Sequence, residues 1–360
     1  MVMETLQLIS GLNGEIHLWR LALMIKNIRN AVLLAVGLLL VIFHLAPTYA
    51  AAPVVTTQAP GFYRMMLGDF EITALNDGVI AYDTAELLPS ATPKQIEKSL
   101  HAAGLMDPVG MSYNAYLINT GKKLVLIDTG TGGKLSNSPF FAGAGRLMSN
   151  LGAAGYQPEQ VDEIYITHRG QDHIGGLTIG VNRAFPNALI RAPTQEFDIF
   201  LDPGKREAAL AKSNHNEKFK EWIQFTHDLF KPYIKARQFE SFSGDLELTP
   251  GIRSLATYGH TPGHTSYVVE STGQTLFILG DLVLMAAMQF ADPLITSAFD
   301  GDPQAASIQR QRILQLAVKN NYWLAGSHLS FPGIGHVRPA EEGYQWIPIN
   351  YMVPKKAAEK

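Results

Sequence analysis

The stretch Thr167-His168-Arg169-Gly170-Gln171-Asp172-His173 decides how this chain is interpreted. Residues 161–167 are predicted to form a buried strand, so two imidazoles and a carboxylate follow at its carboxyl end. Neutral imidazole nitrogen and carboxylate oxygen are the ligands that borderline and hard divalent cations take in proteins. The stretch therefore predicts a loop that holds part of a metal site.

The same kinds of side chain follow other predicted strands further along the chain. His264 closes the loop of residues 259–264, Asp281 follows a strand at 275–279, and His328 follows a strand at 322–326. Taken singly, each of these side chains has an ordinary explanation as a hydrogen-bonded loop residue. Taken together, they give candidate metal ligands in four separated loops: His168, Asp172, His173, His264, Asp281 and His328.

These motifs resemble those of the metallo-β-lactamase superfamily. The segments outside the metal loops resemble, more narrowly, the secreted methyl parathion hydrolases of that superfamily, which are organophosphate hydrolases; these segments include residues 61–64, 67–72, 124–130 and 155–160. The order of strands and helices agrees with this resemblance. Both imply an α/β fold, an αβ/βα sandwich of two mixed β-sheets with outer helices.

The resemblance also implies that the four loops hold two zinc-type ions. One ion would be bound by His168, His264 and Asp281. The other would be bound by a set that shares the bridging carboxylate: Asp172, His173, Asp281 and His328. Asp172 and Asp281 are the candidate catalytic residues.

The loop departs from the family pattern at Gly170, where the motif His-x-His-x-Asp-His has its second histidine. Loss of a ligand imidazole should cost at least the 10- to 100-fold in metal affinity or activity that loss of a supporting partner typically costs. An extra water or the side chain of Gln171 would then complete the first site, or that site would be empty. Gly170→His is accordingly expected to raise metal occupancy and turnover.

The activity implied by the resemblance is hydrolysis of organophosphate triesters or similar neutral esters, a phosphotriesterase-like reaction. Two cations that share a water lower its pKa toward neutrality and so supply hydroxide as the nucleophile. One alternative is a lactonase or arylesterase with the same metal centre. The other is a metal-poor, non-catalytic binding protein that keeps the fold after losing a ligand at Gly170.

Several other side chains are assigned smaller roles from the sequence. Aromatic residues that would line a leaving-group pocket, with core packing as the competing explanation, are Phe140, Phe141, Phe200, Phe219 and Trp222. Asp128 is expected to be structural, and His260 to shape its loop without binding metal. Arg169 is expected either to bind an anionic group or to point to solvent. Ordinary loop or surface positions are expected for His101, His215, His227 and His336.

The first residues read as a secretory signal peptide with an N-terminal extension, residues 1–52, ahead of a hydrolase domain at residues 53–360. Arg20, Lys26 and Arg29 precede an uncharged apolar run at residues 31–43, and small residues follow at 48–52. Cleavage after Ala50 or Ala52 would give a periplasmic or secreted protein. A retained membrane anchor is the alternative, although the run is shorter than the roughly 20 residues that a bilayer requires. Translation from Met24 would give a leader of ordinary length.

Composition narrows the chemistry further. The chain has no cysteine, which excludes disulfides, thiolate zinc sites and cysteine nucleophiles. Its net charge of −3 argues against a nucleic-acid partner. The expected partner is a small-molecule ester, with no stable membrane association after signal removal and with a homodimer as a further possibility.

Overall fold

The computed structural model describes residues 2–45, 52, 54–55, 58–136, 138–212 and 216–353. It divides into one compact unit that ends at Thr57 and a second that begins at Gln58. His215 and most of the expected cleavage segment, residues 48–51, lie outside the described residues.

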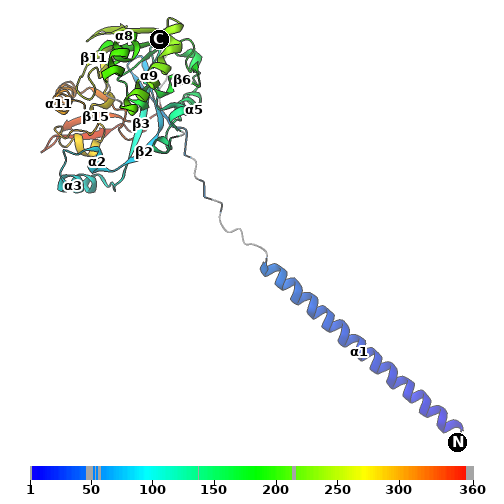
Figure 1. The fold of residues 1–360 in the computed structure, drawn as a ribbon. Coiled ribbons are helices and arrows are strands. Elements are labelled where there is room, and N and C mark those ends of the chain that lie inside the picture. The colour runs from blue at the N-terminus through cyan, green and yellow to red at the C-terminus, as the bar shows by residue number, and fades with distance from the viewer. Residues whose placement is uncertain are drawn as a thin grey trace. The chain divides into compact units, whose positions relative to one another are not determined.

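The N-terminal unit is a single helix, α1 (Val2–Leu45) (Figure 1). Within it, residues Leu18–Leu39 are long and apolar enough to cross a membrane by length and composition. This stretch is longer than the run at residues 31–43 that the sequence indicated. Signal sequences meet the same criterion, so the signal peptide and the membrane anchor both remain predictions.

The second unit contains two seven-stranded sheets and a two-stranded ribbon. The first sheet has, in spatial order, β1 (Phe62–Leu67), β2 (Phe70–Tyr82), β3 (Val109–Asn119), β4 (Leu124–Ile127), β5 (Glu163–Tyr165), β8 (Leu189–Pro193) and β9 (Phe239–Phe242). The second has β10 (Glu247–Thr249), β11 (Ile252–Ala256), β12 (Thr265–Ser271), β13 (Gln274–Ile278), β14 (Trp323–Ala325), β15 (Ile334–Pro339) and β16 (Tyr344–Pro348). The ribbon is β6 (Thr178–Ile179) and β7 (Asn182–Arg183). Parallel pairs join β4, β5, β8 and β9 in the first sheet and β13 with β14 in the second, so both sheets are mixed.

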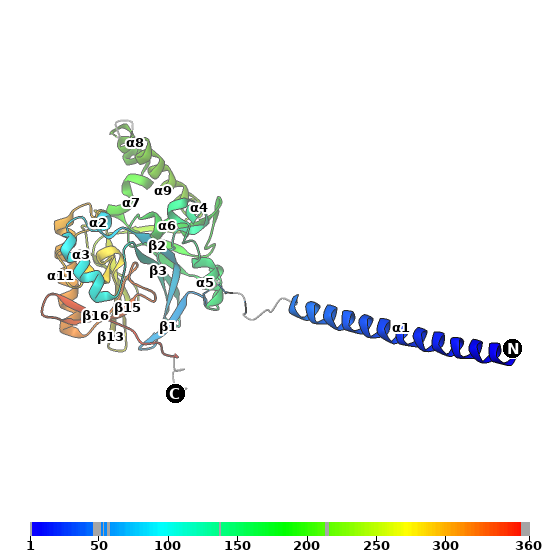
Figure 2. The same cartoon turned by 90° about the horizontal axis from the view of Figure 1, so that it is seen from below.

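The sheets face each other across an apolar core, and helices cover their outer faces. Tyr116 and Ile127 of the first sheet share one buried cluster with Tyr267 and Ile278 of the second. Helices α5 (Leu147–Ala153), α7 (Thr194–Leu201) and α9 (Glu217–Lys235) bury apolar side chains against the first sheet, and α11 (Pro303–Asn320) does so against the second. Figures 1 and 2 show α5 and α11 on opposite outer sides of the strands. The predicted αβ/βα sandwich is confirmed.

The remaining α-helices lie in the connections between strands. They are α2 (Thr84–Leu87), α3 (Pro93–Ala103), α4 (Gly132–Ser136), α6 (Gln171–Ile174), α8 (Pro203–Lys212) and α10 (Ala286–Gln289). The segment that bears α7, α8 and α9 forms one side of the unit in Figure 2.

An Asn-Asp-Gly sequence between two apolar stretches, as at residues 76–78, is typical of a β-hairpin turn. The Asn-Asp-Gly at residues 76–78 does not turn a hairpin, because β2 runs straight through it and pairs with β3 with a bulge between Asn76 and Gly78. The Asp77 carboxylate is buried and accepts hydrogen bonds from the amides of Thr131 and Leu147 at 2.8 and 2.9 Å. A Cβ at Gly78 would lie 2.1 Å from the carbonyl oxygen of Gly143. Residues 76–78 therefore hold neighbouring loops in place against β2.

An ion-pair network joins Glu163, the first residue of β5, to side chains next to β5 in the sheet. The buried carboxylate of Glu163 pairs with Lys123 and with Arg191, whose Nε lies 3.0 Å away, and accepts the Tyr165 hydroxyl hydrogen bond at 2.7 Å. Burial opposes ionisation of this carboxyl, yet these partners hold its pKa below the usual value. The charged carboxylate thus stabilises the fold.

Candidate metal centre

The sheet topology brings the four candidate loops to one edge. β5 delivers the loop with His168, and α6, which begins just after Gly170, carries Asp172 and His173. Asp281 and His328 follow the parallel strands β13 and β14, whose carboxyl ends share an edge. β12 is antiparallel to β13, so its start, just after His264, lies at that same edge. Ligands far apart in the chain can therefore meet.

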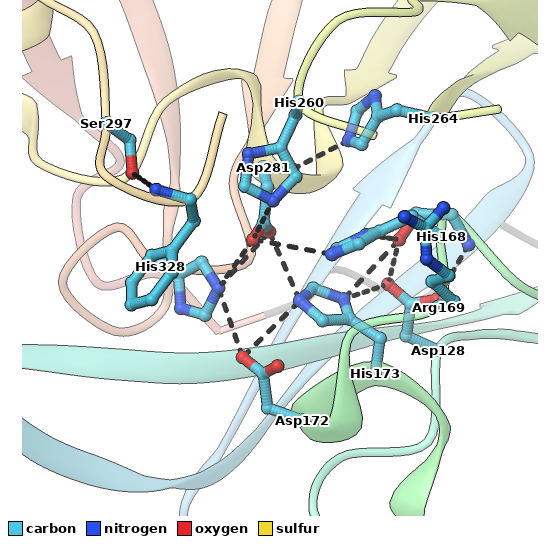
Figure 3. A network of polar contacts seen from close by, with 12 residues as sticks. Asp128, His168, Arg169, Asp172, His173, His260, His264, Asp281, Ser297 and His328 are labelled. Carbon is cyan, nitrogen blue, oxygen red and sulfur yellow. Dashed lines mark hydrogen bonds and ion pairs between the residues drawn. The ribbon is translucent and has the colours of Figure 1, made fainter. Parts of the chain in front are cut away.

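The carboxylate of Asp281 occupies the middle of the cluster (Figure 3). Its Oδ1 lies 3.2 Å from His173 Nε2 and 3.2 Å from His328 Nε2. Its Oδ2 lies 3.6 Å from His168 Nε2 and 3.3 Å from His260 Nε2. One carboxylate thus faces four imidazoles from three different segments, as a bridging ligand would.

Asp172 closes the cluster on the side of α6. Its Oδ2 lies 3.3 Å from His328 Nε2 and 3.5 Å from His173 Nε2. Among the described residues, two groups have all their ligand atoms within 4.8 Å of one another. One is His168, His173 and Asp281, and the other is Asp172, His173 and His328. All predicted ligands except His264 therefore lie in these two groups.

His264 lies beside the cluster with both ring nitrogens engaged. The Asp281 amide donates to His264 Nε2 at 3.0 Å, and His264 Nδ1 lies 2.9 Å from Thr257 Oγ1. Its ring centroid is 5.3 Å from that of His168. His264 thus supports the loop of Asp281 in this structure.

The donor set fits a divalent cation. His173 Nε2 and Asp281 Oδ1 are buried, lie 3.2 Å apart and have no hydrogen-bond partner. A buried polar atom without a partner costs about 1–3 kcal/mol, and a cation bound by both atoms would remove that cost. Asp128 Oδ2 lies 2.7 Å from His173 Nδ1 and so fixes the ring with Nε2 toward the carboxylates. Asp128 is therefore a positioning residue, in agreement with its expected structural role.

Burial and charge set the protonation of the imidazoles. Burial lowers the pKa of His264 to about 3 and that of His168 well below its usual value, so both rings are neutral at pH 7. Burial also opposes the charged form of His173, but Asp281, Asp172 and Asp128 raise its pKa well above the usual value. The carboxylates therefore create a place for positive charge that a proton or a metal ion can fill.

Arg169 forms an ion pair with a carboxylate of the protein. Its guanidinium does not point to solvent, because Nη1 pairs with the buried Glu196 at 2.9 Å and the head group lies 4.9 Å from the Trp222 ring centroid. Glu196 Oε1 also accepts the Arg169 amide at 3.0 Å, and Oε2 accepts the Gly263 amide at 2.8 Å. One carboxylate of α7 thus ties two of the metal loops together.

The cluster forms the floor of a cavity of about 440 Å³. Of the predicted pocket aromatics, Phe140, Phe141 and Trp222 line it. Phe200 and Phe219 do not line it. Phe200 is fully buried and packs on Trp222 with 4.6 Å between ring centroids, and Phe219 packs on Trp222 with 5.9 Å between ring centroids. A larger, open groove between α3, α10 and α11 contains none of the predicted ligands.

Sequence reasoning missed two tyrosines and one phenylalanine of this cavity. Tyr82 and Tyr113 come from β2 and β3, and their hydroxyl oxygens lie 2.5 Å apart. The Tyr113 ring lies 4.9 Å from the His328 ring, edge to face. Phe299 completes the rim beside Tyr82. The aromatic character of β2 and β3 was visible in the sequence, but only the sheet register shows that these rings face the metal loops.

Comparison with known proteins identifies the family. The model of the metallo-beta-lactamase superfamily matches residues 109–328. The chain belongs to this superfamily. A solved structure described as hydrolase AbOPH in beta lactamase superfamily is 33% identical, has a TM-score of 0.74, and aligns over 82% of this chain and 100% of its own. The protein is thus a metal-dependent hydrolase of the superfamily.

Two further relatives are lactonases. AidC, a dizinc quorum-quenching lactonase solved in complex with a product, is 26% identical with a TM-score of 0.71, over 81% of this chain and 99% of its own. The N-acyl homoserine lactonase of Bacillus cereus is 27% identical over 209 residues, which are 54% of this chain and 73% of the relative. The narrower likeness to methyl parathion hydrolases remains a prediction.

Proposed function

We propose that this protein hydrolyses the lactone ring of N-acyl homoserine lactones or similar cyclic esters. The observation that carries the proposal is the pair of ligand groups that share His173 and lie around Asp281 at the floor of a cavity. The likeness to lactonases supports the lactone over the organophosphate triester that the sequence resemblance favoured. The lactonase alternative thus becomes the leading function.

The residues that would hold the metals follow from the geometry. Asp172, His173 and His328 would bind one divalent cation, proposed as zinc, and His168 and Asp281 would bind a second. When bound, such a pair polarises an ester carbonyl or phosphoryl oxygen and acidifies water. Because its side chain is the more exposed of the two carboxylates, Asp172 is the candidate to accept a proton from water and pass it to the leaving alkoxide.

The tyrosine pair is suited to orient the ester. Burial raises the pKa of Tyr82 to about 12, and burial raises that of Tyr113 further, so both hydroxyls keep their protons at pH 7. One hydroxyl of the pair donates to the other, which leaves one proton for a substrate oxygen. We propose that Tyr82, nearer the rim beside Phe299, donates to the substrate.

The aromatic side chains that line the cavity also suit a second candidate substrate. Phe140, Phe141 and Trp222 offer ring surfaces to an acyl chain, and they suit an aryl leaving group equally well. An aryl phosphotriester with a good leaving group therefore remains the second candidate, because it needs little help from a general acid.

A side-by-side assay tests the proposal. The zinc-loaded protein is given N-hexanoyl homoserine lactone, an aryl acetate and a methyl aryl phosphotriester, and kcat/KM is measured for each. We expect the lactone to have the highest value. The Asp281→Asn variant, prepared in parallel, is the control for contaminating hydrolases. A lactone rate no higher than that of this control refutes the proposal, and a protein that also retains no metal favours the non-catalytic binding protein.

A further inference from the structure

His260 points its imidazole into the metal centre from the loop between β11 and β12. The side chain is buried, and its Nε2 lies 3.3 Å from Asp281 Oδ2. Its ring centroid is 5.0 Å from that of His168 and 5.7 Å from that of His264. Figure 3 shows the ring directly above the Asp281 carboxylate. From the sequence alone, His260 was expected only to shape its loop.

The other nitrogen of His260 is held by a buried carboxylate. Asp300 Oδ1 lies 2.9 Å from His260 Nδ1, and the Ser297 amide donates to Asp300 Oδ2 at 2.8 Å. The Asp300 side chain is 1% exposed and also lies 3.9 Å from the guanidinium of Arg310. Metal-binding histidines typically donate their second N–H to such a carboxylate, which fixes the ring and its tautomer.

The His260 ring is oriented with one nitrogen toward each of two carboxylates. Because Asp300 holds Nδ1, Nε2 is the atom that faces Asp281 Oδ2, 3.3 Å away. An imidazole nitrogen and a carboxylate oxygen that face each other at this distance are placed as two ligands of a single cation would be.

The loop around Gly170 explains why the first site needs another imidazole. The chain has no side chain at this position, and a Cβ there would lie 2.6 Å from His168 Nε2. The His168 ring thus occupies the space into which a side chain at residue 170 would extend. The imidazole of the family's second histidine is therefore missing, and the His168 ring fills the space that it would need.

We propose that His260 Nε2 is a ligand of the first metal site and supplies the imidazole that Gly170 lacks. With His168 and Asp281, it gives that site three protein ligands before His264 is counted, the number that a catalytic zinc normally has. The inference rests on the proposed metal centre and does not depend on which ester is the substrate.

The test is a metal titration of the unaltered protein and of His260→Asn, each stripped of metal with a chelator. Asparagine places its amide nitrogen near the position of Nδ1, so it keeps a donor for Asp300 and removes Nε2. His336→Asn is the matched control, because His336 is a partly buried histidine of β15 whose ring lies on Trp323, outside the centre. Calorimetry with zinc and the visible absorption of bound cobalt report both sites without any substrate.

We expect two ions per chain in the unaltered protein and in His336→Asn. In His260→Asn we expect the dissociation constant of one ion to rise at least 10-fold, with a changed cobalt spectrum. Two ions bound by His260→Asn with unaltered affinity overturn the inference, and so does an unaltered protein that binds only one ion.

A second measurement covers the case in which His260→Asn does not fold. Anomalous scattering from crystals of the zinc-loaded, unaltered protein should place His260 Nε2 about 2.0–2.1 Å from a zinc ion. A nearest zinc more than about 3 Å away overturns the inference. Two bound ions, with His260 as a ligand but no ester hydrolysis, would instead refute only the proposed function.

Discussion

The loop at Gly170 leaves no room for a side chain unless a metal ligand moves. A Cβ atom there would lie 2.6 Å from His168 Nε2, 2.8 Å from His173 Cδ2 and 3.0 Å from Asp172 Oδ1. The backbone would accept a side chain, because its φ of −55° and ψ of 137° are open to any L-residue. The cost of Gly170→Ala therefore falls on the neighbouring ligands.

The size of the effect follows from these contacts. Nonbonded carbon and nitrogen atoms settle about 3.5 Å apart, so the His168 imidazole has to retreat by about 0.9 Å. Metal–ligand distances tolerate a deviation of only about 0.2 Å. We therefore expect Gly170→Ala to weaken metal binding at the first site by about 10- to 100-fold. The same reasoning applies to Gly170→His, for which the sequence alone predicted a gain in occupancy and turnover.

Zinc titration of the metal-free variants by calorimetry measures this directly. Gly152→Ala is the matched control, because Gly152 lies in α5 and a Cβ there meets nothing within 4 Å. We expect Gly152→Ala to bind zinc as the unaltered protein does. The reasoning is refuted if Gly170→Ala or Gly170→His binds two zinc ions as tightly as the unaltered protein, or more tightly.

Four other outcomes follow from the structure. Asp281→Asn should lose at least one zinc ion per chain by elemental analysis, and unchanged zinc content would contradict its central position. Tyr82→Phe should lower kcat/KM for the lactone about 2- to 10-fold at unchanged zinc content, the effect of one hydrogen bond. Equal rates would show that the Tyr82 hydroxyl does not donate to the substrate. Glu163→Gln should lower the free energy of unfolding in urea by about 1–3 kcal/mol at pH 7. Because the folded-state pKa of Glu163 is lowered, that difference should shrink as the pH falls below 4.5, and a constant difference would show that charge is not its cause. Amino-terminal sequencing of exported protein should begin at Ala51 or Pro53, whereas an intact α1 in the membrane fraction would favour an anchor.

The sequence predicted most of the centre because its signal is local. His168, Asp172 and His173 share one short loop after a strand, and Asp281 and His328 each follow a strand directly. The parallel strands β13 and β14 place the loops of Asp281 and His328 at a common edge of the second sheet. Packing of the first sheet on the second then brings the loop after β5 to the same place.

What the sequence did not predict depends on partners distant in the chain. His260 and His264 stand in the same loop, and only Asp300, forty residues on, shows which way the His260 ring points. In the same way, Asp77 reads as part of a turn until Thr131 and Leu147 supply its hydrogen bonds. Residue spacing does not encode either contact.

The Glu196 carboxylate connects the wall of the cavity to the loops that carry the candidate metal ligands. It sits on α7, in the helical segment whose Trp222 faces the cavity, and it holds the amides of Arg169 and Gly263 in the two histidine loops. Substitutions that reshape this wall for a new substrate therefore also strain the loops that retain the ions. Substitutions at Phe140, whose ring contacts those of Tyr82 and Phe141, should accordingly change specificity with less effect on the metals.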